Sequence, residues 1–509
     1  MAHISPGGQY ILAHDLGTSM NKATLYGTDG IPAASATCEY PTTYPFAGAV
    51  EQDPDDWMRA VCATTRELID TAGVSPGDII AVSFSGQMMG CLAVDSGGDK
   101  LYNHIIWADL RAVKQAERME RLIGGDAIYN STGHRVSASY SAAKLLWIRD
   151  NLPDIYKKTY KILHAKDYII QKLTGKFVTD YSDASGMNLF DLKTLDWNRD
   201  ILDALDIDIS LLPELHRSAD VVGRVTAGAA RLTGLLEGTP VVAGGGDGSC
   251  ACVGAGVVAE GRMYNVIGSS SWISKASREP AADPRKRVFT WVHLDETLLT
   301  PCGTMQTAGY AVSWLRDTLC QMEKDRASAE HISPYKLIDD LAQRSMPGAG
   351  GALFLPYLLG ERSPRWNPRA TASFLGLRMT STREDMVRAV LEGVGYNLKV
   401  ILDILKGPET ASIVAIGGGA KSERWLQMLS DIWQCPIEVP RYLEEATSIG
   451  AAVCGGVGVG AFRDYSVIGQ FNPIVKTIMP DPEKAGVYGK MYDLFNEAYM
   501  ALEPWYGLG

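Results

Sequence analysis

The sequence predicts an α/β protein built from two large domains. Apolar segments of strand length alternate with helical segments along the whole chain, which is the pattern of α/β folds. The chain has 509 residues, whereas a single hydrophobic core stops growing at roughly 250–300 residues. We therefore expect one domain over residues 1–249 and a second over residues 250–509.

Composition and charge narrow the class of protein. The formal net charge of −11 argues against a nucleic-acid-binding surface, which normally carries a basic excess. The nine cysteines are scattered without a C-x-x-C pair, so we expect reduced thiols and no zinc ribbon. The chain start lacks the basic residues and apolar stretch of a signal peptide, which favours a cytoplasmic location.

Two apolar stretches raise the question of a membrane span. Residues 241–259 contain Asp247 and many glycines, and residues 449–462 are shorter than the roughly 20 residues that a helical span needs. We therefore expect no membrane partner. The glycines of the second stretch instead predict a helix packed tightly inside the protein.

The first half opens with a strand at residues 10–13, a turn and a second strand that begins with Lys22. The turn carries Asp15, Gly17, Thr18 and Ser19. A carboxylate suits hydrated Mg²⁺, glycine lets the backbone approach a phosphate, and successive amides and hydroxyls bind anions. An ordinary hairpin turn explains the same residues equally well.

Four further segments of the first half have clear local signals. Residues 79–84 read as a buried strand, with residues 91–94 as its neighbour after a turn. Residues 54–72 read as a helix capped by Asp53. Residues 141–151 read as a second helix, which ends before a proline.

Side chains of two loops in the first half predict a ligand-binding wall. They are Gln87, Met88 and Met89 after the buried strand, and Trp107 and Asp109 after another apolar stretch. Polar groups there can bond hydroxyls, while Trp107 offers an apolar face to the carbon backbone of a sugar. A surface ion pair between Asp109 and Arg111 beside a packed tryptophan is an equally good explanation.

A single carboxylate follows three glycines near the expected domain junction. The apolar segment at residues 241–243 leads into these glycines and delivers Asp247. An Asp in this position can accept the proton of a substrate hydroxyl, as in phosphoryl transfer. The alternative is an Asp that caps the next helix. The buried strand before it favours the functional interpretation, because strand ends carry sites in α/β folds.

The second half repeats the strand, turn and strand pattern and adds a glycine-rich turn. Strands at residues 263–267 and 272–275 flank a turn with Gly268 and Ser269, although glycine–serine turns also recur by chance. A strand at residues 413–416, a turn with Gly418 and Gly419, and a helix at residues 423–433 form a plausible nucleotide cradle. This turn is neither a Walker A loop nor a dinucleotide fingerprint.

The order of these motifs resembles the FGGY carbohydrate kinases, and within them the xylulose-kinase-like branch. The segments that carry the resemblance are residues 15–18, 139–151, 360–368, 372–377 and 385–393, and together they cover almost the full length. The resemblance implies two ribonuclease-H-like domains of the actin and hexokinase type, with the active-site cleft between them. It implies the substrates ATP and a small sugar, with Mg²⁺ as cofactor.

The resemblance also implies roles for individual residues. Asp247 matches the catalytic base and Asp15 the Mg²⁺ carboxylate. The positions that match the nucleotide site are Gly17, Thr18, Ser19, Gly268, Ser269, Gly303 and Thr304 of a further loop, Gly418, Gly419 and Ser422. The positions that match the sugar site are Gln87, Met88, Met89, Trp107, Asp109 and Asp247.

The implied reaction transfers the γ-phosphate of ATP to a hydroxyl of a small sugar, most directly a ketopentose such as D-xylulose. Met89 stands where these kinases usually carry His, and Gly248 where they often carry Asn. Both changes remove hydrogen-bonding groups, which leaves open ribulose, L-xylulose, erythritol or a glycerol-like polyol. A non-enzymatic, ATP-driven binding protein on the actin-like fold is the alternative of another class, and a homodimer is left open.

Overall fold

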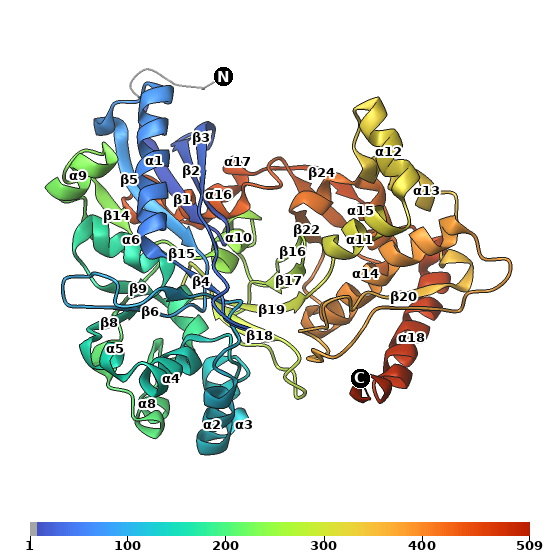
Figure 1. Ribbon diagram of the computed structural model, residues 1–509. Helices are drawn as coiled ribbons and strands as arrows, with labels where there is room; N and C mark the ends of the chain where they lie inside the picture. The colour runs from blue at the N-terminus through green and yellow to red at the C-terminus, as the bar shows by residue number, and fades with distance from the viewer. Residues whose placement is uncertain (1–7, 509) are drawn as a thin grey trace.

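The computed structural model describes residues 8–508 and shows two α/β halves, each organised around a seven-stranded sheet (Figure 1). The first sheet has the order β13-β14-β5-β1-β2-β3, and β15 also pairs with β5. Its strands are β1 (Tyr10–Leu16), β2 (Met20–Gly27), β3 (Pro32–Glu39), β5 (Ile79–Gly86), β13 (Val221–Arg224), β14 (Pro240–Val242) and β15 (Gly245–Gly246). The predicted α/β class is confirmed.

The two helices predicted in the first half lie where the sequence predicts them. Helix α1 (Pro54–Ala72) begins after Asp53, whose side chain accepts a hydrogen bond from the backbone N–H of Asp55. It packs on β2 and β3 with Trp57 fully buried. Helix α4 (Ser141–Asn151) ends before Pro153, also as predicted. Caps and proline act within one turn, so they can be read locally.

The second sheet has the order β18-β19-β17-β16-β22-β23-β24. Its strands are β16 (Met263–Ile267), β17 (Ser271–Lys275), β18 (Phe289–Val292), β19 (Leu299–Met305), β22 (Ile413–Ile416), β23 (Ile437–Pro440) and β24 (Ile474–Ile478). Helices α14 (Arg383–Leu405) and α15 (Glu423–Trp433) pack together beside this sheet. The predicted strands at β16 and β22 and the predicted helix α15 are confirmed.

Helix α16 (Ala446–Gly458) crosses from the second half of the sequence onto the first sheet, where it packs on β1 and β5. It also packs on α10 (Asp247–Gly254), so closely that a Cβ on Gly450 would lie 2.0 Å from the carbonyl oxygen of Cys250. This contact confirms the tight helix packing predicted for residues 449–462. Within residues 8–508, no helix is long and apolar enough to cross a membrane.

The prediction that residues 91–94 form the neighbour of the strand β5 is wrong. Strand β6 (Leu92–Val94) pairs with β8 (Lys161–Leu163) in a separate two-stranded sheet, while β5 pairs with β1, β14 and β15. An apolar run predicts burial but does not specify the partner strand. All nine cysteines are free thiols, and seven of them are buried. The chain start, interpreted above as lacking a signal peptide, lies outside the described residues.

Candidate active site

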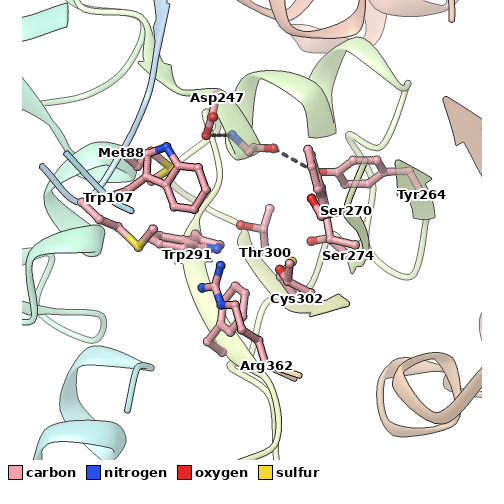
Figure 2. Close-up of a pocket in the computed structure, with 15 residues that line it drawn as sticks. Met88, Trp107, Asp247, Tyr264, Ser270, Ser274, Trp291, Thr300, Cys302 and Arg362 are labelled. Atoms are coloured by element: carbon pink, nitrogen blue, oxygen red, sulfur yellow. Dashed lines mark hydrogen bonds between the residues drawn. The ribbon is translucent and has the colours of Figure 1, made fainter. Parts of the chain in front are cut away.

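A cavity of about 170 Å³ lies between the two sheets and takes its lining from both halves of the chain (Figure 2). The first half contributes Met88, Met89, Trp107, Asp247 and Gly248, and the second half contributes Tyr264, Ser270, Trp272, Ser274, Phe289, Trp291, Thr300, Cys302, Thr304 and Arg362. Of the residues predicted from sequence, the structure thus brings Met88, Met89, Trp107, Asp247 and Thr304 together.

Asp247 is the first residue of α10 and follows directly on β15. The backbone directly before Asp247 is closely packed, because a Cβ on Gly246 would lie 2.4 Å from the sulfur of Met88. Burial, followed by the nearby charge of Asp15, raises the pKa of Asp247 to about 7. A carboxylate with a pKa near neutrality is well matched to accepting a proton from a substrate hydroxyl.

Asp15 lies near the end of β1, close enough to Asp247 for its charge to raise the pKa of that carboxyl. Its Oδ2 accepts a hydrogen bond of 2.7 Å from Oγ1 of Thr447 on α16, and burial raises its pKa. In the described part of the chain, no ion pair joins Asp15 or Asp247 to a basic side chain. Two neighbouring carboxylates without a cation partner form a donor set that suits a hard divalent cation.

The turn after Asp15 is held by side chains from distant segments. Oγ1 of Thr18 accepts a hydrogen bond of 3.0 Å from Nε1 of Trp107, and the hydroxyl of Tyr40 donates to the carbonyl oxygen of Gly17. Ser19 is exposed at the tip. The Trp107 bond therefore ties the predicted phosphate turn directly to a side chain that lines the cavity.

The second hairpin turn connects β16 to β17. The backbone N–H of Gly268 donates to the carbonyl oxygen of Ser270, and the carbonyl oxygens of Gly268 and Ser269 accept from residues 308–310 at the start of α11 (Gly309–Thr318). This turn is therefore held in place by the N-terminus of α11. Ser270 lines the cavity, whereas Gly268 and Ser269, the residues predicted from sequence, do not.

The remaining nucleotide-side residues occupy two places. Gly303 and Thr304 lie within the strand β19 rather than in the predicted loop. Gly418 and Gly419 lie beside the end of β16, where a Cβ on Gly419 would lie 2.4 Å from Ile267. Oγ of Ser422 caps α15 and donates to Asp339. These last three residues do not line the cavity.

Two predicted sugar-site residues are turned away from the cavity lining. Nε2 of Gln87 donates a hydrogen bond of 2.7 Å to Gln52. Asp109 is fully buried and accepts hydrogen bonds from the backbone N–H of Val50, 2.6 Å away, and from Nε of Arg111, 2.8 Å away. The ion pair between Asp109 and Arg111 that was considered from sequence is present, but it is buried and not on the surface.

Sequence reasoning missed the wall that the second half contributes. Trp291 packs against His134 with ring centroids 4.3 Å apart, and Arg362 extends its guanidinium into the cavity (Figure 2). Among the described residues no ion pair or side-chain hydrogen bond occupies that guanidinium. Arg362 lies in the segment 360–368, which carries part of the resemblance to the carbohydrate kinases. The sequence therefore drew attention to this segment but predicted no function for Arg362.

Known proteins resemble this chain over its full length. Sequence models described as the FGGY family of carbohydrate kinases match residues 10–254 (N-terminal domain) and residues 263–459 (C-terminal domain). A xylulose kinase of Bacillus subtilis is 31% identical and covers 96% of this chain and 97% of the relative. A gluconokinase of Bacillus licheniformis is 32% identical, with 98% of this chain and 97% of the relative covered.

Solved structures of carbohydrate kinases also match almost the whole chain. A ligand-bound xylulose kinase from Lactobacillus acidophilus has a TM-score of 0.91 at 30% identity and covers 98% of this chain and 99% of the other. A gluconate kinase from the same organism has a TM-score of 0.90 at 29% identity, also with 98% and 99% covered.

Proposed function

Since this chain belongs to the FGGY family of carbohydrate kinases, we propose that it transfers the γ-phosphate of ATP to a hydroxyl of D-xylulose or a closely related ketopentose. The chain is a sugar kinase by its family. The observation that carries the finer proposal is the position of Asp247, which reaches a cavity walled by Trp107 on one side and by the second sheet on the other.

The chemistry proposed for Asp247 is general base catalysis. Its carboxylate accepts the proton of the attacking hydroxyl, and a pKa of about 7 leaves a substantial fraction ionised at neutral pH. The indole of Trp107 packs on the carbon face of the sugar and keeps the hydroxyl oriented. The aromatic walls exclude water, which otherwise competes with the sugar as acceptor of the phosphoryl group.

The residues proposed to hold the nucleotide come from both halves of the chain. Thr18 on one turn and Ser269 on the other are positioned to donate to phosphate oxygens, while Gly418 and Gly419 take the adenosine side. Asp15 would hold Mg²⁺, an ion that neutralises charge on the transferring phosphoryl group when it is bound. The proximity of the Asp15 and Asp247 carboxylates, neither of which forms an ion pair in the described residues, supports this assignment.

A second candidate substrate is a sugar acid of the aldonate class, such as gluconate. The unpartnered guanidinium of Arg362 lies in the cavity with Asp247, and an Arg fork pairs in bidentate fashion with carboxylates. A linear sugar acid can place its terminal hydroxyl at Asp247 and its carboxylate at Arg362. The gluconokinase relatives are as similar to this chain as the xylulose kinases are.

A coupled ATP-consumption assay over ketopentoses, polyols and aldonates tests the proposal. We expect phosphorylation of a ketopentose, with D-xylulose first. A clear preference for an aldonate would instead select the second candidate. ATP hydrolysis that no sugar in the panel accelerates, with no phosphorylated sugar formed, would contradict both candidates and favour a non-enzymatic ATP-driven protein.

A further inference from the structure

The loop at residues 88–90 forms part of the cavity wall but has no regular secondary structure to hold it. Met89 adopts a left-handed backbone conformation with φ of 64°, which is unfavourable for a residue other than glycine. On the far side the loop is closely packed, because a Cβ on Gly90 would lie 1.9 Å from Nε2 of His104. A loop of this kind keeps its shape only when its surroundings fix it.

The first turn of α4 supplies that support. Nζ of Lys144 donates a hydrogen bond of 2.8 Å to the carbonyl oxygen of Met89 and one of 2.5 Å to that of Ser139. Oγ of Ser141 donates a hydrogen bond of 2.6 Å to the carbonyl oxygen of Gly90. Two consecutive carbonyl groups of the cavity loop are thus bonded to side chains one turn apart on the same helix.

Lys144 is an unusual residue for its position. It is fully buried, and in the described part of the chain no carboxylate forms an ion pair with it. Burial lowers its pKa to about 7, although the charge of Asp109 acts in the opposite direction. Burying an amine without hydrogen-bond acceptors is costly in either protonation state. The bonds from Nζ to the carbonyl oxygens of Met89 and Ser139 therefore account for its burial.

We propose that Lys144, together with Ser141, is a positioning residue that fixes the loop at residues 88–90 in the shape that receives the sugar. The proposal rests on the proposed function only in identifying the cavity as the sugar site. Lys144 does not touch the substrate; it acts through Met89. Its loss should therefore affect the sugar and spare the nucleotide, because the phosphate turns lie on other segments.

The primary test is hydrogen exchange of the peptide covering residues 86–92, measured without ligands. Lys144→Met should accelerate exchange in this peptide, and Ser141→Ala should do so to a smaller degree. Arg149→Met on the same helix is the matched control, because Nη1 of Arg149 also donates to two backbone carbonyls, those of Leu205 and Asp206, both 2.8 Å away. It should leave the peptide unchanged.

The second test is a comparison of kinetic constants. Lys144→Met should raise KM for the sugar roughly tenfold or more while KM for ATP stays within about twofold, as expected when a buried charge-assisted hydrogen bond is lost. Unchanged exchange in folded Lys144→Met, or equal rises of both KM values, would overturn the proposal. If Lys144→Met does not fold, unchanged exchange and sugar KM in Ser141→Ala overturn it.

Failure of the proposed function is distinguishable from failure of this inference. A wild-type protein that phosphorylates no sugar argues against the function. The exchange comparison needs no substrate and still decides whether Lys144 holds the loop.

Discussion

Oδ2 of Asp15 accepts a 2.7 Å hydrogen bond from Oγ1 of Thr447, which joins the first strand of the chain to the helix α16. The two residues are 432 positions apart in sequence. The hydroxyl helps to fix the orientation of a carboxylate that forms no ion pair among the described residues. Removing a group that orients a metal-binding side chain typically lowers metal affinity or activity by roughly 10- to 100-fold.

Thr447→Val should weaken the use of Mg²⁺. We expect the Mg²⁺ concentration for half-maximal activity to rise roughly tenfold or more, because an outer-shell partner is lost. Titration of activity with Mg²⁺ at saturating ATP and sugar measures this. Ser448→Ala on the same helix is the control, since it removes a hydrogen bond to Tyr26 instead. An identical Mg²⁺ dependence in both variants would show that Thr447 does not orient Asp15.

Asp247→Ala should abolish the acceptance of the substrate proton while the nucleotide still binds. Turnover should fall by a factor on the order of 10²–10⁴, the usual contribution of a general base. Steady-state kinetics together with ATP titration by calorimetry separates the two effects. Near-normal turnover in this variant would show that another group is the base.

The raised pKa of Asp247 makes stability depend on pH. The folded-state pKa of about 7 exceeds the value near 3.9 of an unfolded Asp, so the folded state binds more protons between these values. This contribution to stability is present at low pH and is lost as pH rises through about 7. Asp247→Asn should therefore stabilise the protein at pH 8 relative to wild type, and the gain should shrink towards pH 4.

Thermal unfolding in the presence of a chelator measures this pH effect without interference from bound metal. The surface substitution Asp154→Asn serves as the control, because Asp154 is exposed. A gain from Asp247→Asn that is equal at pH 5 and pH 8 would contradict the raised pKa.

Arg362→Gln separates the two substrate candidates. If an aldonate is the substrate, its kcat/KM should fall by roughly 10- to 100-fold through loss of a charged hydrogen-bond donor. A neutral ketopentose should be affected much less. Arg365→Gln on the same segment is the control, because Arg365 bonds to Asn496 and stacks on Tyr499 instead. Equal losses on acidic and neutral sugars would remove carboxylate recognition as the role of Arg362.

Asp109→Ala should lower the free energy of unfolding. Arg111, which is only 1% exposed, pairs with both Asp109 and Glu51. Removing Asp109 leaves Glu51 to balance the guanidinium but takes the acceptor from the buried donors of Arg111 and Val50, which should cost about 1–3 kcal/mol. Urea unfolding measures the loss. Asp99→Ala, which breaks the exposed pair with Lys172, should cost at most about 1 kcal/mol. If Asp109→Ala leaves stability unchanged and raises the KM for the sugar, the result would instead support a sugar-binding function for Asp109.

The sequence by itself determined the features that depend on neighbours within a few positions. The boundaries of α1, α4 and α15 follow from caps, prolines and helical periodicity. The turns after Asp15 and Ile267 and the glycines before Asp247 were visible because backbone geometry restricts which residues fit there. The α/β class followed from the alternation of these elements.

Only the tertiary structure decided which distant segments meet. It paired Thr447 with Asp15, assigned β6 to a different sheet from β5, and turned Asp109 towards Arg111 and away from the cavity. It also placed Arg362 in the same cavity as Asp247. Periodicity reports that a side chain is buried but not what it packs against, because that choice is made by the fit between surfaces of elements far apart in the chain.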